Sequence, residues 1–400
     1  MINKQISFSK KNFKKIILYS ILIFAFIKPD SLEYIGLKWL DTLLILIDST
    51  VMVVLFLFLI TKKYRISNCS IIILLIYISI GVCTIFGQKD YFSLLKVAGT
   101  SFGFALFTDF MLQRNPDIYF KASITTLIIL FSINFITIII YYPTGMYEME
   151  KIVGDLYFMG HDNGMIYNLI PLSALSLLYA YLKKGKFVTW YTICALFLLF
   201  ASVIYVQSAT GIIEAILLLL LVFMYDNKYL SRIIKPSILI FIYLLFNVLI
   251  VFMRIQNYFS WFIVDMLGKD LTFTGRTILW DYTIYKVMKN HFMGYGTGVV
   301  IPGTNNHTYP HCHNLLLDFL FKGGIFALIF FILLLCVFSK YYYRVVDKKI
   351  AKLILIPLFI LLFGEITSAV PYKIYFWSFF VLIQYANEIK AYYEIRRKQI

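Results

Sequence analysis

Histidines cluster directly before one of the long apolar runs of this chain. The segment HTYPHCHNLLLDFLFKGGIFALIFF extends from His307 to Phe331 and sets His311 and His313 at the edge of the run. Imidazole is the side chain that exchanges a proton near neutral pH. A base at that edge, within one helical turn of lipid, suits chemistry on a lipid-linked substrate.

A cationic candidate, Arg276, lies in the segment GRTILWDYTIYKVMKNHFMGYGTG. We predict a short helix that starts near Arg276, is capped by Thr274 and carries Trp280 on its apolar face. An arginine in the first turn opposes the helix dipole, but together with the free amides of that turn it suits a phosphate or pyrophosphate. The alternative is an exposed arginine paired with Asp270 or Asp281.

Two glycines, Gly294 and Gly296, follow this predicted helix in an alternating pattern. Such a pattern lets backbone amides approach an anion, and a tight turn is the alternative interpretation. A nucleotide-binding loop is excluded by its context, because no strand precedes these glycines.

A zinc site formed by the histidines and Cys312 has suitable ligand types. Three consecutive residues do not converge readily on one tetrahedral ion, and no second ligand pair has a recognised spacing. We therefore expect no metal ion and no other cofactor. Asp318 and Lys322 stand at i, i+4, so we expect them to pair on a helix.

The composition predicts the elements that position these residues. Hydrophobic residues make up 61% of the chain and charged residues 14%, with a mean hydropathy of +0.81, which is typical of a membrane protein. Apolar runs of roughly 20 residues, enough to cross a hydrocarbon core, recur along the chain and do not alternate with polar residues. We predict an all-α polytopic membrane protein, a single transmembrane domain over residues 1–400. About twelve spans are expected, at residues 14–28, 40–60, 69–86, 92–112, 122–142, 163–182, 187–206, 210–226, 236–253, 313–339, 352–370 and 373–389.

Charge predicts the orientation of these spans. Lysines and arginines gather in alternate loops, which should be cytoplasmic together with both termini. The formal net charge of +16 therefore reflects topology, and we expect no nucleic-acid partner. All five histidines map to the opposite, external side. The connection 254–312 is a large external loop that contains the short helix and part of the active site, and Cys312 in it should react with reagents added from outside.

A family resemblance rests on these residues. The segment GRTILWDYTIYKVMKNHFMGYGTG followed by HNLLLDFLFKGGIFALIFF resembles the paired signature of the O-antigen ligase and polymerase family. That signature runs Gly-Arg, Trp, a Gly-x-Gly turn, and His-Asn opening a helix with spaced glycines. The matching residues are Gly275, Arg276, Trp280, Gly294, Gly296, His313, Asn314 and Gly324. Weaker matches are Asn163, which opens the sixth span, and Glu365, near the outer end of the eleventh.

The resemblance implies a glycosyltransferase of the bacterial cytoplasmic membrane that takes a glycan from undecaprenyl pyrophosphate on the external face without a metal ion. Catalysis falls to His313, as acceptor of the hydroxyl proton, and to Arg276, as the cation that stabilises the leaving pyrophosphate. The expected substrate-binding residues are Arg254, Asn314, Glu365, Gly294, Gly296, Asn163 and His311. A chain-length regulator and a flippase are possible partners.

One departure from the family pattern concerns a second cation. Where the family often has an arginine at the start of a middle span, this chain has Thr210 in QSATGIIEAIL. Arg254 is the replacement we consider, and an interfacial arginine that merely reaches toward water is the alternative. Glu214, inside the same span, is expected to pair with a neighbouring span or to face a cavity.

Two family activities and one rival remain open. We prefer repeat-unit polymerisation for capsule, O-antigen or exopolysaccharide, because the Ile-, Lys- and Asn-rich composition suggests a low-GC bacterium. The alternatives are O-antigen ligase-type transfer to another acceptor and a lipid-linked oligosaccharide flippase. A flippase would place its key charges in a central cavity that opens to both sides, rather than in one external loop.

Overall fold

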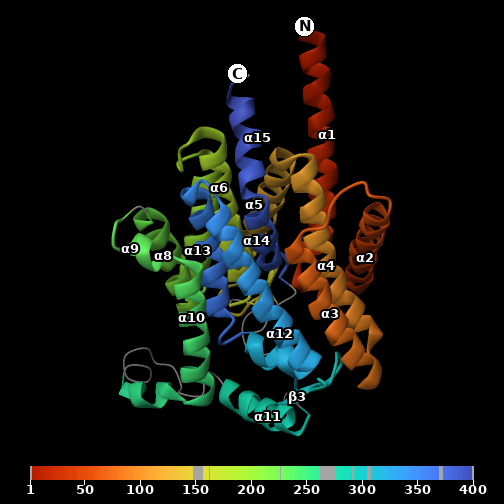
Figure 1. Ribbon diagram of the computed structural model, residues 1–400, viewed down its shortest axis with the longest axis vertical. Coiled ribbons are helices and arrows are strands. Elements are labelled where there is room, and N and C mark those ends of the chain that lie inside the picture. The colour runs from red at the N-terminus through yellow and green to blue at the C-terminus, as the bar shows by residue number, and fades with distance from the viewer. Residues whose placement is uncertain are drawn as a thin grey trace.

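The chain forms a bundle of helices in the computed structural model (Figure 1), which describes residues 2–146, 156–161, 163–225, 227–261, 275–290, 292–303, 308–368 and 373–398. The first half contains α1 (Ile2–Ile27), the 3-10 helix η1 (Asp30–Glu33), α2 (Lys38–Ile60), α3 (Asn68–Phe86), α4 (Tyr91–Arg114), α5 (Pro116–Tyr141), β1 (Leu156–Tyr157), β2 (Gly160–His161), α6 (Ile166–Lys184) and α7 (Trp190–Tyr205). The second half contains α8 (Ala209–Met224), α9 (Leu230–Ile233), α10 (Pro236–Asn247), the π-helix η2 (Val248–Phe252), the 3-10 helix η3 (Ile255–Phe259), α11 (Arg276–Lys289), β3 (Ile301–Pro302), β4 (Thr308–Tyr309), α12 (Leu315–Arg344), α13 (Lys348–Gly364), α14 (Ile374–Gln384) and α15 (Ala386–Lys398).

The predicted all-α membrane class is confirmed in its broad form. Among the described residues, five helices are long and apolar enough to cross a membrane, namely α2, α3, α4, α5 and α12. Four shorter apolar helices accompany them, namely α7, α8, α10 continued by η2, and α14. Each of the twelve predicted spans coincides with helical structure, while the number that crosses the bilayer stays a prediction. Two antiparallel strand pairs, β1 with β2 and β3 with β4, are small additions that the apolar runs did not predict.

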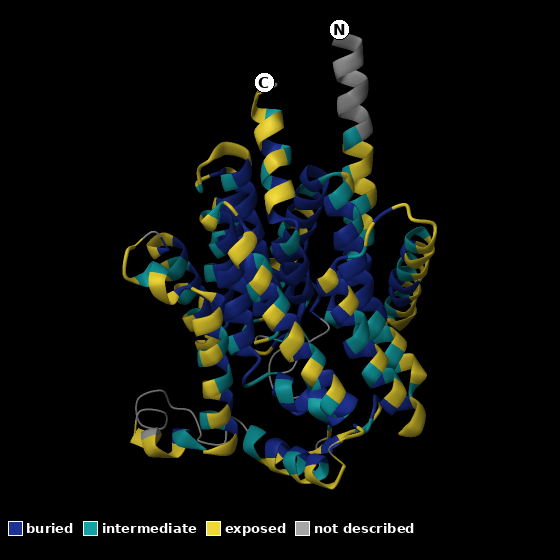
Figure 2. Cartoon of the chain, in the orientation of Figure 1, coloured by how far each residue is buried: buried dark blue, intermediate teal, exposed yellow. Residues whose placement is uncertain are grey.

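Large apolar side chains on the outside of the bundle agree with this class. Leu46, Val53 and Phe223 are each about half exposed or more, and comparable side chains recur on most of the outer helices. Figure 2 shows buried residues concentrated in the middle of the bundle and exposed ones on its periphery. Exposed apolar surface of this extent is unfavourable in water and is what a helix bundle offers to lipid.

Both chain ends lie at one end of the bundle, and α11 with β3 lies at the other (Figure 1). An even number of membrane crossings, as predicted, would place both chain ends on the same side. The end of the bundle that carries α11 is named the outer end below. The most extensive packing joins α12 to α3, α2 to α4 and α1 to α5. Helix α12 therefore ties the family-signature segment to the first half of the chain.

A separate small core holds α11 on the outer end. Leu279 and Trp280 of α11 pack with Ile301 of β3 and with Leu317 and Phe321 of α12. The predicted start of the short helix at Arg276 is confirmed. Its buried face consists of Leu279, Trp280, Thr283 and Val287.

Helix α12 is interrupted at Gly324, where φ is 66° and ψ is −167°. The break frees carbonyl groups of the preceding turn, and the loop after α11 satisfies them: the amides of Tyr295 and Gly296 donate to the carbonyls of Phe321 and Lys322, at 2.7 and 2.9 Å. A Cβ on Gly324 would lie within 3 Å of backbone atoms of Phe292 and Gly294. The spaced glycine of the signature therefore allows two backbone segments to touch.

Candidate active site

His311 and His313 lie against each other just before α12. Their ring centroids are 4.3 Å apart, and the ring of Tyr309 in β4 lies 5.5 Å from that of His313. His313 adopts a left-handed backbone with φ of 54°, which is uncommon for a residue other than glycine. In the part of the chain that the structure describes, Nδ1 of each histidine is buried without a hydrogen-bond partner. Such a nitrogen is available to a substrate.

Arg276, the first residue of α11, acts electrostatically on both rings. Burial and, to a smaller extent, the nearby positive charge of Arg276 lower the pKa of His313 to about 3. Burial also lowers the pKa of His311 well below its usual value, assisted by His313, Lys322 and Arg276. Both imidazoles are therefore in the neutral form at pH 7, in which one ring nitrogen bears a proton and the other can accept one.

Trp280 connects α11 to the histidine backbone. Its indole Nε1 donates a hydrogen bond of 3.4 Å to the carbonyl of His313, and the side chain is fully buried. Since Trp280 stands four residues after Arg276, both face the same side of α11. The Gly-Arg and Trp elements of the signature are thus held against the His-Asn element.

Arg254 lies beside the first turn of α11. Its Nη2 donates to the Thr277 carbonyl at 3.3 Å and to Oδ1 of Asp281 at 2.5 Å, and the guanidinium lies 5.0 Å from the Trp280 ring centroid. Nη1 is buried and has no hydrogen-bond partner within the described ranges. Arg254 is thus fixed next to Arg276 with one donor group available to an anion.

Asn314, the residue after His313, is held by hydrogen bonds to three different segments. Its side chain caps α12 by accepting from the amide of Leu317 at 2.9 Å, and its Nδ2 donates to Oδ1 of Asn247 and to the carbonyl of Ile366, at 2.8 and 2.9 Å. An asparagine that both caps a helix and bonds two other elements sets the position of its neighbour His313. The predicted helix start at this residue is confirmed.

Two carboxylates lie deeper in the bundle, on the side of α13. Glu365 is 1% exposed and follows α13, and its backbone carbonyl accepts from the amide of Leu315 at 3.0 Å. Glu214 of α8 is 5% exposed, and neither carboxylate oxygen has a hydrogen-bond partner among the described residues. A Cβ on Gly364 would lie 2.6 Å from Oε1 of Glu214 and 2.8 Å from the hydroxyl of Tyr167. Glu214 therefore abuts the end of α13, next to Glu365.

The structure favours a packing role for the glycines that were predicted to bind substrate. A Cβ on Gly294 would lie 2.4 Å from the Lys322 carbonyl carbon, and one on Gly296, whose φ is 76°, would lie 2.5 Å from Cα of Thr84. The Gly296 amide already donates to the Lys322 carbonyl. The tight-turn interpretation fits these contacts, and an anion nest does not.

Cys312 corrects a second expectation. We predicted that it would react with reagents from outside, but its side chain is completely buried and Sγ donates to the carbonyl of Asn314 at 3.3 Å. Burial also raises the pKa of its thiol, so little reactive thiolate forms. Within the described ranges, no group of three or more histidine, cysteine, aspartate or glutamate side chains could hold a metal ion.

The remaining predicted residues have separate environments. Oδ1 of Asn163 accepts from the hydroxyl of Ser208 at 2.8 Å, which links it to the start of α8. Asp318 and Lys322 form the predicted i, i+4 ion pair at 2.9 Å. His307, His291, Thr274 and Asp270 lie outside the described residues.

Part of the chain that includes this site is similar to a known protein family. A family model described as O-antigen ligase matches residues 194–332. Over these residues the chain is similar to the O-antigen ligase family. The match contains Arg254, Arg276 and His313, and the predicted resemblance is confirmed. No curated protein and no solved structure matches the chain.

The matched region, residues 194–332, extends from α7 into α12 and contains both arginines and both histidines of the site. Glu365 and Asn163 lie outside it. Within it, Asn247 and Tyr309 were not predicted. A polar residue in the apolar span 236–253 was a usable signal for Asn247, whereas only the pairing of β3 with β4 brings Tyr309 to His313.

Proposed function

We propose that this protein polymerises undecaprenyl-pyrophosphate-linked oligosaccharide repeat units at the external face of a bacterial cytoplasmic membrane. Glycan transfer from a lipid-linked donor is the general activity of an O-antigen ligase relative. The observation that carries the proposal is the meeting of His313 and Arg276, which are distant in sequence but close enough for the arginine charge to act on the imidazole.

The reaction needs a proton acceptor and a stabilised leaving group. An acceptor hydroxyl attacks the anomeric carbon of the donor, the bond from that carbon to the diphosphate oxygen breaks, and the hydroxyl proton passes to the neutral imidazole of His313. The departing diphosphate takes the bonding electrons, and its growing charge is stabilised by the guanidinium of Arg276 and the amides of the first turn of α11. No metal ion is required in this scheme.

Arg254 is proposed as the second cation that binds the diphosphate. It would take the role of the arginine that the family often has at the position of Thr210. Its Nη2 is held by Asp281, while Nη1 has no partner among the described residues and is free to donate to the diphosphate. A diphosphate bound between the two guanidiniums would offset the positive charge of Arg276. Since that charge is one of the two causes that depress the pKa of His313, donor binding should make the imidazole a stronger base.

His311, Asn314 and Glu365 are proposed as supporting residues. The ring of His311 contacts that of His313 edge to face, and Asn314 fixes the start of α12. Glu365 lies at the end of α13 that Asn314 contacts through the Ile366 carbonyl. We do not carry Gly294 and Gly296 into the binding site, because their contacts are to protein backbone.

Polymerisation is preferred to ligation on composition, as argued from the sequence. Ligase-type transfer to a different acceptor uses the same proton transfer and the same leaving group, so the arrangement of His313 and Arg276 serves both. A flippase is disfavoured, because a transported substrate would need no proton acceptor beside the guanidinium. A chain-length regulator and a flippase are proposed as partners of the polymerase.

Reconstitution in vesicles with synthetic undecaprenyl-pyrophosphate repeat units tests the proposal. We expect a ladder of carrier-linked polymers from the wild type and no ladder from His313→Ala or Arg276→Ala at equal expression. His161→Gln is the matched control, because His161 lies in β2 and has no role in the proposed reaction. Transfer only to an added foreign acceptor would replace polymerisation by ligation, and full activity of His313→Ala would refute the catalytic assignment.

A further inference from the structure

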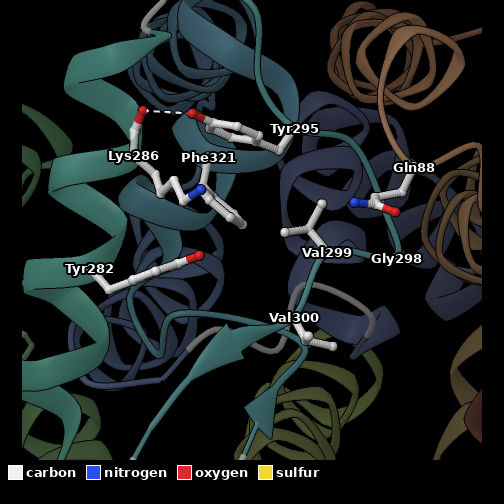
Figure 3. Close-up of a pocket in the computed structure, with 8 residues that line it drawn as sticks. All are labelled: Gln88, Tyr282, Lys286, Tyr295, Gly298, Val299, Val300 and Phe321. Atoms are coloured by element: carbon white, nitrogen blue, oxygen red, sulfur yellow. Dashed lines mark hydrogen bonds between the residues drawn. The ribbon is translucent and has the colours of Figure 1, made fainter.

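A cavity of about 440 Å³ opens at the far end of α11 from the histidines (Figure 3). It is lined by Gln88, Tyr282, Lys286, Tyr295, Gly298, Val299, Val300 and Phe321. These residues come from the turn between α3 and α4, from α11, from the loop that follows it, and from α12. The volume is within the range of pockets that hold small organic ligands.

The lining combines ring faces, one cation and neutral polar groups. Nζ of Lys286 lies 5.6 Å from the ring centroid of Tyr282 and 5.7 Å from that of Tyr295. Figure 3 shows the Tyr282 hydroxyl and the Lys286 amine directed into the space, which Val299, Val300 and Gln88 bound on the opposite side. In the described part of the chain, no carboxylate pairs with Lys286. The cation is thus held by rings and left available to an anion.

Hydrogen bonds hold the loop that forms part of the wall of this cavity. The Tyr295 hydroxyl donates to the Lys286 carbonyl at 2.9 Å, and the Tyr295 amide donates to the Phe321 carbonyl. On the other side, the Thr297 amide donates to Oγ1 of Thr84 at 3.0 Å. These bonds fix the loop between α3, α11 and α12, so the opening exists before any ligand binds.

The strand pair β3 and β4 connects the Val300 wall of the cavity with His313. The residue after Val300 begins β3, which pairs with β4, so that Ile301 lies opposite Tyr309. Tyr309 in turn contacts the His313 ring. Along α11, the ten residues from Arg276 to Lys286 correspond to about 15 Å. A chain of a few sugar residues could extend along this wall from the proton acceptor to the cavity.

We propose that this cavity binds an anionic sugar residue of the acceptor glycan, several residues away from the hydroxyl that reacts. This inference rests on the proposed glycan transfer and adds the place and chemistry of acceptor recognition. Tyrosine rings suit the apolar face of a sugar, Gln88 and the Tyr282 hydroxyl suit its hydroxyl groups, and Lys286 pairs with a carboxylate such as that of a uronic acid. An acyl chain would leave these polar groups without partners.

Binding is tested on the detergent-purified full chain by saturation-transfer NMR with two probes, cellobiouronic acid and neutral cellobiose. We expect the acidic disaccharide to bind better, and Lys286→Met to weaken that binding about tenfold, the loss typical of a charge-assisted hydrogen bond. Lys289→Met is the matched control, because Lys289 stacks on Tyr285, outside the cavity. Equal binding of the acid by wild type and Lys286→Met, or no binding of either probe, overturns the proposal.

A second variant, Val300→Trp, fills the cavity without changing its charge. In reconstituted vesicles supplied with an acidic repeat unit, we expect it to raise the KM for the acceptor severalfold while kcat stays unchanged. An unaltered KM in both Val300→Trp and Lys286→Met refutes the cavity as an acceptor site. Failure of the glycan-transfer proposal gives a different result, since the wild type would then form no product even while the acidic disaccharide binds.

Discussion

The two ends of α11 provide different environments for the same helix. At its first turn, Arg276 lies close to the buried pair His311 and His313, whose pKa values are lowered by burial and positive charge. Roughly two and three turns later, Tyr282 and Lys286 line an open cavity. At the first turn, the buried imidazole of His313 can change its charge during a reaction. At the other end, the cavity can hold a solvated ligand without chemical change to that ligand.

The contrast teaches that reaction and recognition need opposite degrees of burial. A proton acceptor gains from exclusion of water, because electrostatic effects are strong in a dry site. A sugar that must enter and leave needs an accessible pocket with hydrogen-bonding groups at its edge. A rigid helix, tied to α12 by Trp280 at one end and by the loop of Tyr295 at the other, keeps both at a constant separation.

The largest expected effect separates the two histidines at the buried end. His313→Gln should lower kcat by about 10²–10⁴-fold, the usual contribution of a general base. His311→Gln should cost much less, because His311 acts only through the edge-to-face contact of its ring with that of His313. Single-turnover assays with a synthetic lipid-linked repeat unit measure both. If the two variants lose activity equally, the base cannot be assigned to His313 alone.

The next effect separates the two arginines. Arg276→Gln should lower kcat by about 10²–10³-fold, as expected for loss of one group that stabilises a developing anion. Arg254→Gln removes the ion pair to Asp281 and one diphosphate donor, so a smaller loss is expected, together with a raised KM for the donor. A larger loss for Arg254→Gln would reverse the proposed roles.

The shape of the cavity at the open end of α11 should depend on the contact between Gly294 and the break in α12. Gly294→Ala places a methyl group 2.4 Å from the Lys322 carbonyl carbon, and overpacking of this kind costs about 1–3 kcal/mol. We expect a lower Tm and weaker binding of acidic sugar. Gly185→Ala is the control, because a Cβ there meets nothing within 4 Å and only its left-handed backbone costs about 1 kcal/mol. Equal effects of both substitutions would contradict close packing at Gly294.

The smallest effect is a pH dependence of stability at the buried end. His313 has a pKa of about 3 in the folded protein and about 6.5 when unfolded. Between these values the unfolded chain binds more protons, so stability falls as pH is lowered from about 6.5. Thermal unfolding of the purified protein between pH 7 and pH 5 should show a falling Tm, and His313→Gln should make the fall shallower. An identical slope in that variant would show that the imidazole of His313 is not buried in the neutral form.

Much of the site could be predicted from local sequence. The helix that begins at Arg276, the helix that Asn314 opens and the pair of Asp318 with Lys322 all depend on residues within one or two turns of each other. The accessibility of Cys312 was predicted wrongly. Its position before an apolar run does not reveal that the small core between α11 and α12 covers its side chain. Gly294 and Gly296 were predicted to bind substrate for a similar reason, since the backbone contacts that favour a packing role come from α3 and α12.

What the sequence determined by itself is the membrane class, the helices and the order of the signature residues, because these follow from the transfer of apolar side chains out of water and from the helical period. What only the tertiary structure decided is which groups meet. Arg276 acts on His313, Arg254 binds Asp281, and Gly294 touches Gly324. Each of these contacts joins residues at least 27 positions apart, where packing of whole helices sets the distance and no local periodicity can predict it.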